Sequence, residues 1–293
     1  LPFPCPLRGD DRPGHRRSGQ CAQGRLRRGD HRGAVPAPLR ARLPRLPAFR
    51  YLWLATRRGP GPAQGRCRAG RAGDPADADG WSDTMTDPRV TPTNGRVAHV
   101  SLEGAAEAER FVEGRWMSVQ QPIVNLTDTP RGNRTTQLLF GERFLVLDEE
   151  DGLVFGQCEK DGYVGYLAAG ALAPGEVATH WITAPATHLY PRPDFKAPPD
   201  VSLFFGARVT VTGEERNGYH RISTGHFIPA QHAMPVRATF ADPLGVADLF
   251  LGTPYLWGGS SRWGLDCSGL VQMAFLACGV GCPRDSDQQE DSL

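Results

Sequence analysis

Lysine, glutamate and isoleucine are all absent from the first 84 residues of this 293-residue chain. That segment holds 17 arginines against seven aspartates, a net charge of +10, whereas residues 85–293 hold 16 basic and 25 acidic side chains. It also lacks any apolar period of a helix or a strand that is long enough to build a core. Such a composition buries too little surface to offset the entropy of ordering, so we expect residues 1–84 to be a disordered leader.

The arginine-rich leader has three interpretations. It is a basic arm for nucleic acid or another acidic surface, a disordered segment without a function, or translated upstream sequence from a GC-rich genome. Ordinary composition begins at Met85 and residue 1 is leucine, so we favour the third interpretation and expect no nucleic-acid partner. A start at Met85, directly in polar sequence, predicts a cytoplasmic protein.

Long apolar runs are also missing. No stretch of about 18 apolar residues exists and no secretory signal is visible, so we expect no membrane partner. The seven cysteines are an odd number at irregular spacings, which does not fit a disulfide framework. There is no CxxC pair and no histidine follows Cys267, so we predict neither a metal site nor a cofactor.

Short strands and tight turns fill residues 116–173. Runs rich in Val and aromatic residues favour strands, and the Asp and Gly residues of "DEEDG" and "EKDG" between them suit hairpins. Residues 182–235 repeat the plan, because "LLFGERFLVLDEEDG" aligns with "LFFGARVTVTGEERNG" about 65 residues later. We therefore predict two small β-barrels, over residues 85–176 and 177–240.

Both blocks resemble bacterial SH3-like (SH3b) domains, and "LFGE" followed by "DGYVGYL" makes the first block the better match. The resemblance implies mainly β SH3-like barrels that bind cell-wall peptides. The alternative is a pair of generic small barrels with no binding role.

Two helical patterns follow the second block. Residues 243–251 predict a short helix, and "DCSGLVQMAFLACG" predicts a longer one that starts at about Cys267 and ends at Gly279. Asp266 or Ser268 is placed to cap its start. In a first helical turn, free N–H groups and the helix dipole favour a cysteine thiolate, the nucleophilic form. The alternative, a small buried apolar cysteine, fits Cys278 on the apolar stripe better.

The ordered motifs "PYLWGG", "DCSG" and "PRDSDQQ" over residues 249–293 strongly resemble the NlpC/P60 family of cell-wall cysteine peptidases. That family has an α+β papain-like fold, so residues 241–293 are predicted to be the N-terminal part of such a domain. With SH3b domains upstream, the chain is similar to endopeptidases that cut murein stem peptides between γ-D-glutamate and a diamino acid.

The resemblance also implies roles for individual residues. Cys267 would be the nucleophile that forms an acyl-enzyme, and the Tyr255 hydroxyl would point toward the developing oxyanion. Asp266 and Ser268 would fix the N-terminal part of the substrate, and Ser286 would contact it. For Arg284 and Asp285 we predict a structural ion pair or a turn.

Two residues of the first barrel are further candidates through the same resemblance. Glu142 and Tyr163 would hold the free amine of the substrate's L-alanine, since an ammonium in a cleft needs carboxylates and Asp266 with Glu142 would supply two. The alternative for both is ordinary barrel surface.

A cysteine nucleophile needs a histidine base, and in the family this histidine follows the nucleophile. Here all eight histidines precede Cys267, so we expect the chain to be truncated within the catalytic domain and inactive as written. We also expect its last 50 residues or so to be poorly packed, because the stripe of the Cys267 helix would lack a sheet to cover it.

Two other functions compete with a peptidase. One is a non-catalytic module that binds wall peptides through tandem SH3b domains. The other is an acyltransferase on the same scaffold, whose acceptor would be a lipid or an amine rather than water; the peptide-binding residues argue against it.

Overall fold

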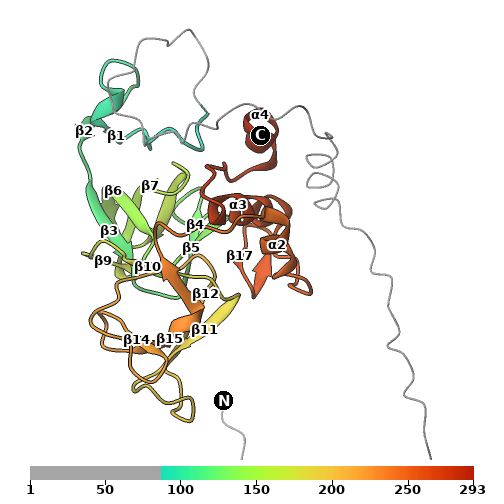
Figure 1. The fold of residues 1–293 in the computed structure, drawn as a ribbon. Coiled ribbons are helices and arrows are strands. Elements are labelled where there is room, and N and C mark those ends of the chain that lie inside the picture. Colours follow the sequence, from blue (N-terminus) through green and yellow to red (C-terminus); the bar gives the residue numbers. More distant parts are fainter. Residues whose placement is uncertain (1–86) are drawn as a thin grey trace, which may run out of the picture. The chain divides into compact units, whose positions relative to one another are not determined.

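The computed structural model describes residues 87–293 (Figure 1). The predicted leader, residues 1–84, lies outside the described residues. Within residues 87–293, none of the helices has the length and apolar character needed to cross a membrane.

The first barrel is a seven-stranded sheet in the order β5-β4-β8-β7-β6-β3-β9, and all its neighbouring strands are antiparallel. Its alternating apolar residues point into one core, in which Leu126, Leu138 and Phe144 are fully buried. The strands are β3 (Arg115–Val119), β4 (Ile123–Thr127), β5 (Arg134–Leu139), β6 (Arg143–Glu150), β7 (Leu153–Cys158), β8 (Val164–Ala168) and β9 (Leu172–Ala173).

Both hairpins predicted in this barrel are confirmed. β6 and β7 are joined by Asp151 and Gly152, with φ angles of 50° and 76°. Positive φ at both central residues matches the right-handed twist of the flanking strands, which is why Asp-Gly suits this turn. β7 and β8 are joined through Gly162, whose φ is 72°.

An N-terminal arm, residues 87–112, packs against the first barrel. It contains β1 (Val97–His99), the 3₁₀ turn η1 (Val100–Leu102) and β2 (Arg110–Val112), and β1 pairs with β2 in parallel. Arg96 and Arg110 each donate to Asp148 on β6, at 2.5 and 2.7 Å. Burial by itself raises the pKa of this aspartate, but the hydrogen bonds from Arg96 and Asn94 outweigh it and lower the pKa overall.

The second block forms its own small β-module with a separate core, which includes Ile182, Leu203 and Ile228. Its elements are β10 (His180–Ile182), β11 (Ala186–Leu189), β12 (Val201–Phe204), β13 (Arg208–Val209), β14 (Tyr219–Arg221), β15 (Phe227–Pro229), the 3₁₀ turn η3 (Ala230–His232) and β16 (Ala233–Pro235). The order β15–η3–β16 repeats the order of β8, η2 (Ala169–Ala171) and β9. The two blocks therefore share this order of secondary-structure elements, as the predicted internal repeat requires. The boundaries of the two domains stay predictions.

Each of the two repeats contains a Phe-Gly pair, and the pair of the first repeat contacts the residues just after the pair of the second. Gly141 and Gly206 lie at equivalent turns and have φ angles of 74° and 92°. Arg208 N donates to Phe140 O at 2.7 Å, and a Cβ added to Gly141 would stand only 2.0 Å from Arg208 O. Glycine is required at position 141 because no side chain fits between these two backbones.

The C-terminal segment, residues 241–293, carries three helices and a small hairpin, which Figure 1 shows in orange and red. They are α2 (Pro243–Asp248), β17 (Ser260–Ser261), β18 (Gly264–Leu265), α3 (Cys267–Ala277) and α4 (Ser286–Ser292). The two predicted helices are confirmed as α2 and α3. Asp242 caps α2 by accepting from Leu244 N and Gly245 N, while Gly279, at a φ of 76°, follows the end of α3.

The expected poor packing of this segment is wrong. The apolar stripe of α3 contributes Ala274 and Ala277 to a core cluster with Trp181 and Phe205 of the second β-module. Val246, in α2, and Phe250, two residues after the end of α2, belong to the same cluster. The expectation considered only a central sheet as a partner for the stripe, but α2 and the second β-module bury it instead.

Phe205 is the best place to test this packing, because it is 1 % exposed and its ring lies 5.3 Å from those of Trp181 and Phe250. Phe205→Ala should lower the free energy of unfolding by about 3–5 kcal/mol through lost burial and a cavity. Phe195→Ala, at a side chain that is 74 % exposed, should change it by less than about 0.5 kcal/mol. Urea denaturation measures both, and equal effects would contradict the packing described.

Candidate active site

Cys267 is the first residue of α3 and is exposed, although Asp266 and Ser268 on either side of it are buried. At the start of α3, the Cys267 side chain is thus exposed between two buried neighbours. This is the position predicted from the sequence, and the alternative of a buried apolar cysteine fits Cys282 and Cys158 instead. Burial raises the pKa of both of those thiols, to about 11 for Cys282.

Asp266 fixes the turn that carries the thiol. Its Oδ1 accepts from Gly269 N at 2.7 Å, which caps α3, and its Oδ2 accepts from Gly258 N at 2.8 Å. The second bond ties the "PYLWGG" loop to the start of the helix. Both oxygens of this carboxylate are thus occupied within the protein.

Arg284 is the third partner of Asp266 and is 1 % exposed. Its Nη2 donates to Asp266 Oδ2 at 2.9 Å and its Nη1 to Ser268 Oγ at 2.9 Å. Its Nε donates to Thr136 Oγ1, on β5 of the first barrel, at 2.7 Å. Arg284 is thus held in a buried ion pair, but its partner is Asp266, whereas Asp285 pairs with Arg89. The contact with Thr136 also links the site to the barrel.

Tyr255 belongs to the "PYLWGG" loop and is 62 % exposed. A parallel bridge pairs Tyr255 with Leu265, which places the loop next to the residues that lead into Cys267. Burial and then the nearby charge of Cys267 raise the pKa of the Tyr255 phenol. The hydroxyl is therefore protonated at neutral pH and available as a hydrogen-bond donor.

The first barrel makes further contacts with this loop. Gln137 Oε1 accepts from Ser260 N at 3.1 Å, and Arg134 Nε donates to Trp257 O at 2.8 Å. At Gly258, an added Cβ would lie 2.9 Å from Thr135 O. The "PYLWGG" loop is thus held between β5 and α3.

Ser286 is the first residue of α4 and is exposed. Gln289, one turn later, donates from Nε2 to Ser268 O at 2.9 Å and to Pro283 O at 2.8 Å. Since Ser268 also accepts from Arg284, the start of α4 is anchored to the residue that follows Cys267.

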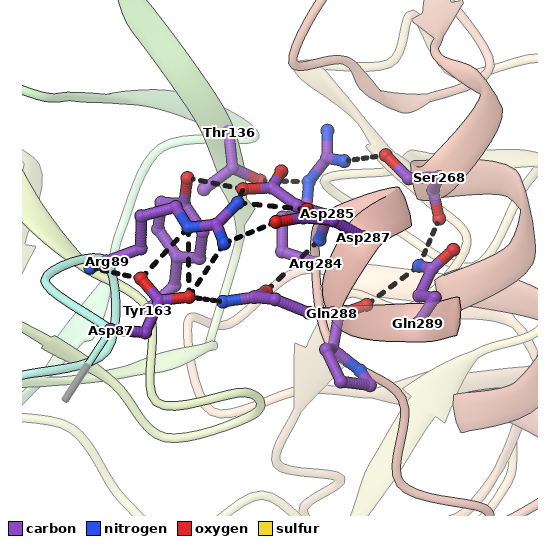
Figure 2. A network of polar contacts seen from close by, with 11 residues as sticks. Asp87, Arg89, Thr136, Tyr163, Ser268, Arg284, Asp285, Asp287, Gln288 and Gln289 are labelled. Carbon is purple, nitrogen blue, oxygen red and sulfur yellow. Dashed lines mark hydrogen bonds and ion pairs between the residues drawn. The ribbon is translucent and has the colours of Figure 1, made fainter. Parts of the chain in front are cut away.

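A polar network on the other side of α4 ties it to the N-terminal arm and the first barrel (Figure 2). Arg89 donates to Asp285 Oδ2 at 2.9 Å, to Asp287 Oδ2 at 2.6 Å and to Asp87 Oδ2 at 2.7 Å. Tyr163 Oη donates to Asp285 Oδ2 at 3.0 Å. Arg89 Nη1 and the Tyr163 hydroxyl therefore share one oxygen of Asp285.

The two candidates of the first barrel have partners within the protein. Glu142 accepts from Lys160 Nζ at 2.9 Å and from Leu139 N at 2.9 Å, and Tyr163 is buried in the barrel core with its hydroxyl on Asp285. Neither contacts Asp266 or Cys267 in the hydrogen bonds of the described residues. Their substrate roles, like that of Asp266, stay predictions.

Two family models match the chain. That of the "Bacterial dipeptidyl-peptidase Sh3 domain" matches residues 126–172, and that of the "NlpC/P60 family" matches residues 252–292. The chain has an SH3-like domain followed by an NlpC/P60 segment. The exposed thiol, Tyr255, Asp266, Ser268 and Ser286 all lie in the NlpC/P60 segment, and Glu142 and Tyr163 lie in the SH3-like domain.

Two curated proteins resemble about half of the chain. The gamma-D-glutamyl-L-lysine dipeptidyl-peptidase of Bacillus subtilis (strain 168) is 33 % identical over 171 residues, 53 % of this chain and 56 % of that protein. The protein of the same name from Bacillus cereus (strain ATCC 10987 / NRS 248) is 27 % identical over 179 residues, 53 % of each chain. The chain thus spans about half the length of these relatives.

A solved structure supports the fold. The crystal structure of an NlpC/P60 family protein from Bacillus cereus ATCC 10987 superposes with a TM-score of 0.53 at 20 % identity. The match covers 60 % of this chain and 77 % of that one. The predicted fold class, SH3-like β structure followed by an NlpC/P60 segment, is therefore confirmed.

The described part of the chain offers no metal centre. Across residues 87–293, no three His, Cys, Asp or Glu side chains are grouped so that they could hold a metal ion. The same residues include no histidine that is hydrogen-bonded to Cys267.

Sequence reasoning missed α4 and Arg89. The signal for α4 was present, since "DSDQ" at 285–288 has the spacing of a capping box and Gln288 Oε1 accepts from Asp285 N at 3.4 Å. No sequence signal pairs Arg89 with residues almost 200 positions later.

Arg284 should be essential for the shape of this site. Arg284→Met would leave the Asp266 charge buried without its partner, which costs about 3–5 kcal/mol of unfolding free energy. Arg192→Met removes a surface arginine that lies 3.4 Å from Asp194 and should cost less than about 1 kcal/mol. Urea denaturation compares the two, and a small loss for Arg284→Met would refute the frame described.

Acid should weaken the network around Arg89. Hydrogen bonds from Arg89 are the main cause that lowers the pKa of Asp87 and of Asp287. Groups with a lowered pKa stabilise the fold above their unfolded pKa of about 4 and lose that effect as the pH falls through the folded value. The difference in Tm between the wild type and Arg89→Met should therefore be full at about pH 6 and shrink below about pH 4. A constant difference down to about pH 2.5 would contradict this.

Proposed function

We propose that the protein is a cysteine peptidase that hydrolyses the bond between γ-D-glutamate and a diamino acid in murein stem peptides. The observation that supports this most directly is the exposed Cys267 thiol at the start of α3, set between the buried residues Asp266 and Ser268.

In the proposed reaction, the Cys267 thiolate attacks the carbonyl carbon of the γ-D-glutamyl bond. The C–N bond then breaks, the diamino acid leaves after its nitrogen takes up a proton, and water hydrolyses the thioester. Tyr255, with its phenol protonated, would donate a hydrogen bond to the oxyanion. In this proposal Asp266, Ser268 and Arg284 form the frame around the nucleophile. No histidine among the described residues is hydrogen-bonded to Cys267.

The substrate class rests on the relatives and on the domain order. Two relatives named for γ-D-glutamyl-L-lysine match 53 % of this chain. The contacts of Thr136 and Gln137 with the site give the SH3-like domain a place in its frame. We propose a cytoplasmic enzyme that acts on free muropeptides.

The test is hydrolysis of L-Ala-γ-D-Glu-L-Lys and of its diaminopimelate form, by the 293-residue chain and by the full product of its gene. Cys267→Ala should reduce kcat/KM by at least about 1000-fold, because it removes the atom that attacks. Cys278→Ala, at a partly buried thiol on the apolar stripe, should keep at least half of the activity.

The outcomes separate the proposal from its competitors. Cleavage that survives Cys267→Ala would overturn the role of the thiol. Tight binding of the tripeptide without cleavage by either protein would favour the wall-peptide binding module, and transfer of the acyl group to an added amine in preference to water would favour the acyltransferase.

A further inference from the structure

We infer that Arg89, from the N-terminal arm, is a positioning residue for the substrate-binding start of α4. This inference rests on the proposed function, because the site it serves is the proposed peptide-binding site at Cys267 and Ser286. None of the hydrogen bonds that Arg89 makes among the described residues goes to Cys267 or Ser286. It acts through the two aspartates on either side of Ser286.

The geometry is that of a clamp. Arg89 Nη1 lies 2.9 Å from Asp285 Oδ2, and Nη2 lies 2.6 Å from Asp287 Oδ2. One planar guanidinium therefore holds both neighbours of Ser286, which fixes the direction of the backbone between them. Figure 2 shows the Arg89 side chain lying between Asp87 and these two aspartates.

The backbone of the arm around Arg89 is hydrogen-bonded to the first barrel. Val164 N on β8 donates to Arg89 O at 2.8 Å, and Gln157 Nε2 on β7 donates to Val90 O at 3.1 Å. Asp87 holds the guanidinium from its own side and accepts from Gln288 Nε2 on α4 at 2.8 Å. The arm thus transmits the position of the barrel to α4.

The inner side of α4 is connected to the nucleophile. Gln289 donates to Ser268 O, and Arg284 donates to Ser268 Oγ and to Asp266. Both neighbours of Cys267 are therefore held by residues in α4 or just before it. Ser286 therefore sits between an outer clamp, Arg89, and an inner anchor, Arg284. The distance between its hydroxyl and Cys267 depends on both.

Surface ion pairs usually contribute little, but this one differs in its charge pattern. Arg89 is the partner that Asp87, Asp285 and Asp287 share, and its side chain is 34 % exposed. Without its charge, three carboxylates would face one another near the start of α4 and repel. We expect the first turn of α4 to move away from the arm while the barrel stays folded.

Arg89→Met should therefore loosen α4 and weaken substrate binding without slowing the chemical step. Amide hydrogen exchange over residues 285–292 should rise at least about tenfold, and KM for L-Ala-γ-D-Glu-L-Lys should rise about tenfold with kcat within about twofold. Arg89→Lys keeps the positive charge but not the planar guanidinium with its paired donors. Its exchange rate and KM should therefore lie between those of the wild type and of Arg89→Met. Arg110→Met, on the same arm but bonded to Asp148 on the barrel, should change neither quantity.

Binding of the same tripeptide to the Cys267→Ala protein gives a readout that needs no turnover. There, Arg89→Met should raise Kd about tenfold. Unchanged exchange over residues 285–292 would overturn the inference, and so would faster exchange with unchanged Kd. If the wild type binds the tripeptide but does not cleave it, the proposed peptidase activity fails while the exchange and Kd measurements still decide the role of Arg89.

Discussion

The buried ion pair between Arg284 and Asp266 is the interaction on which the rest of the site depends. Asp266 caps α3 and holds the "PYLWGG" loop, and Arg284 adds Ser268 and the barrel residue Thr136 to the same cluster. A guanidinium and a carboxylate that are both almost fully buried tolerate little change in geometry, since each would be left uncompensated. This ion pair and its hydrogen bonds hold the buried neighbours of Cys267, Asp266 and Ser268, while the Cys267 thiol itself is exposed.

The SH3-like domain is part of this frame. Its strand β5 supplies Thr136 and Gln137, and its β8 holds the arm that carries Arg89. The second β-module supports the other side of α3 by packing Trp181 and Phe205 against Ala274 and Ala277. Segments far apart in the sequence thereby determine the orientation of α3 and of α4.

Local patterns in the sequence predicted most of the elements, with α4 missed, but not the contacts between them. The hairpin at Asp151–Gly152, the cap at Asp266 and the helix that starts at Cys267 follow from turn chemistry and periodicity, which act over a few residues. The burial of the α3 stripe by Phe205 depends on how two modules meet, and the three aspartates around Arg89 lie up to 198 positions away from it. For Asp266, the family resemblance implied contact with the substrate, and this stays a prediction. Its hydrogen bonds to Gly258 N and to Arg284 could not be predicted from local patterns.

The central claim is that the sulfur of Cys267 attacks the γ-D-glutamyl carbonyl. The most direct measurement is mass spectrometry of the protein after reaction with an L-Ala-γ-D-Glu analogue that ends in a thiol-reactive group, followed by mapping of the adduct. The account predicts one adduct per chain, on Cys267, that excess L-Ala-γ-D-Glu-L-Lys suppresses. An adduct that forms equally on Cys278 or Cys282, or that the peptide does not suppress, would contradict it.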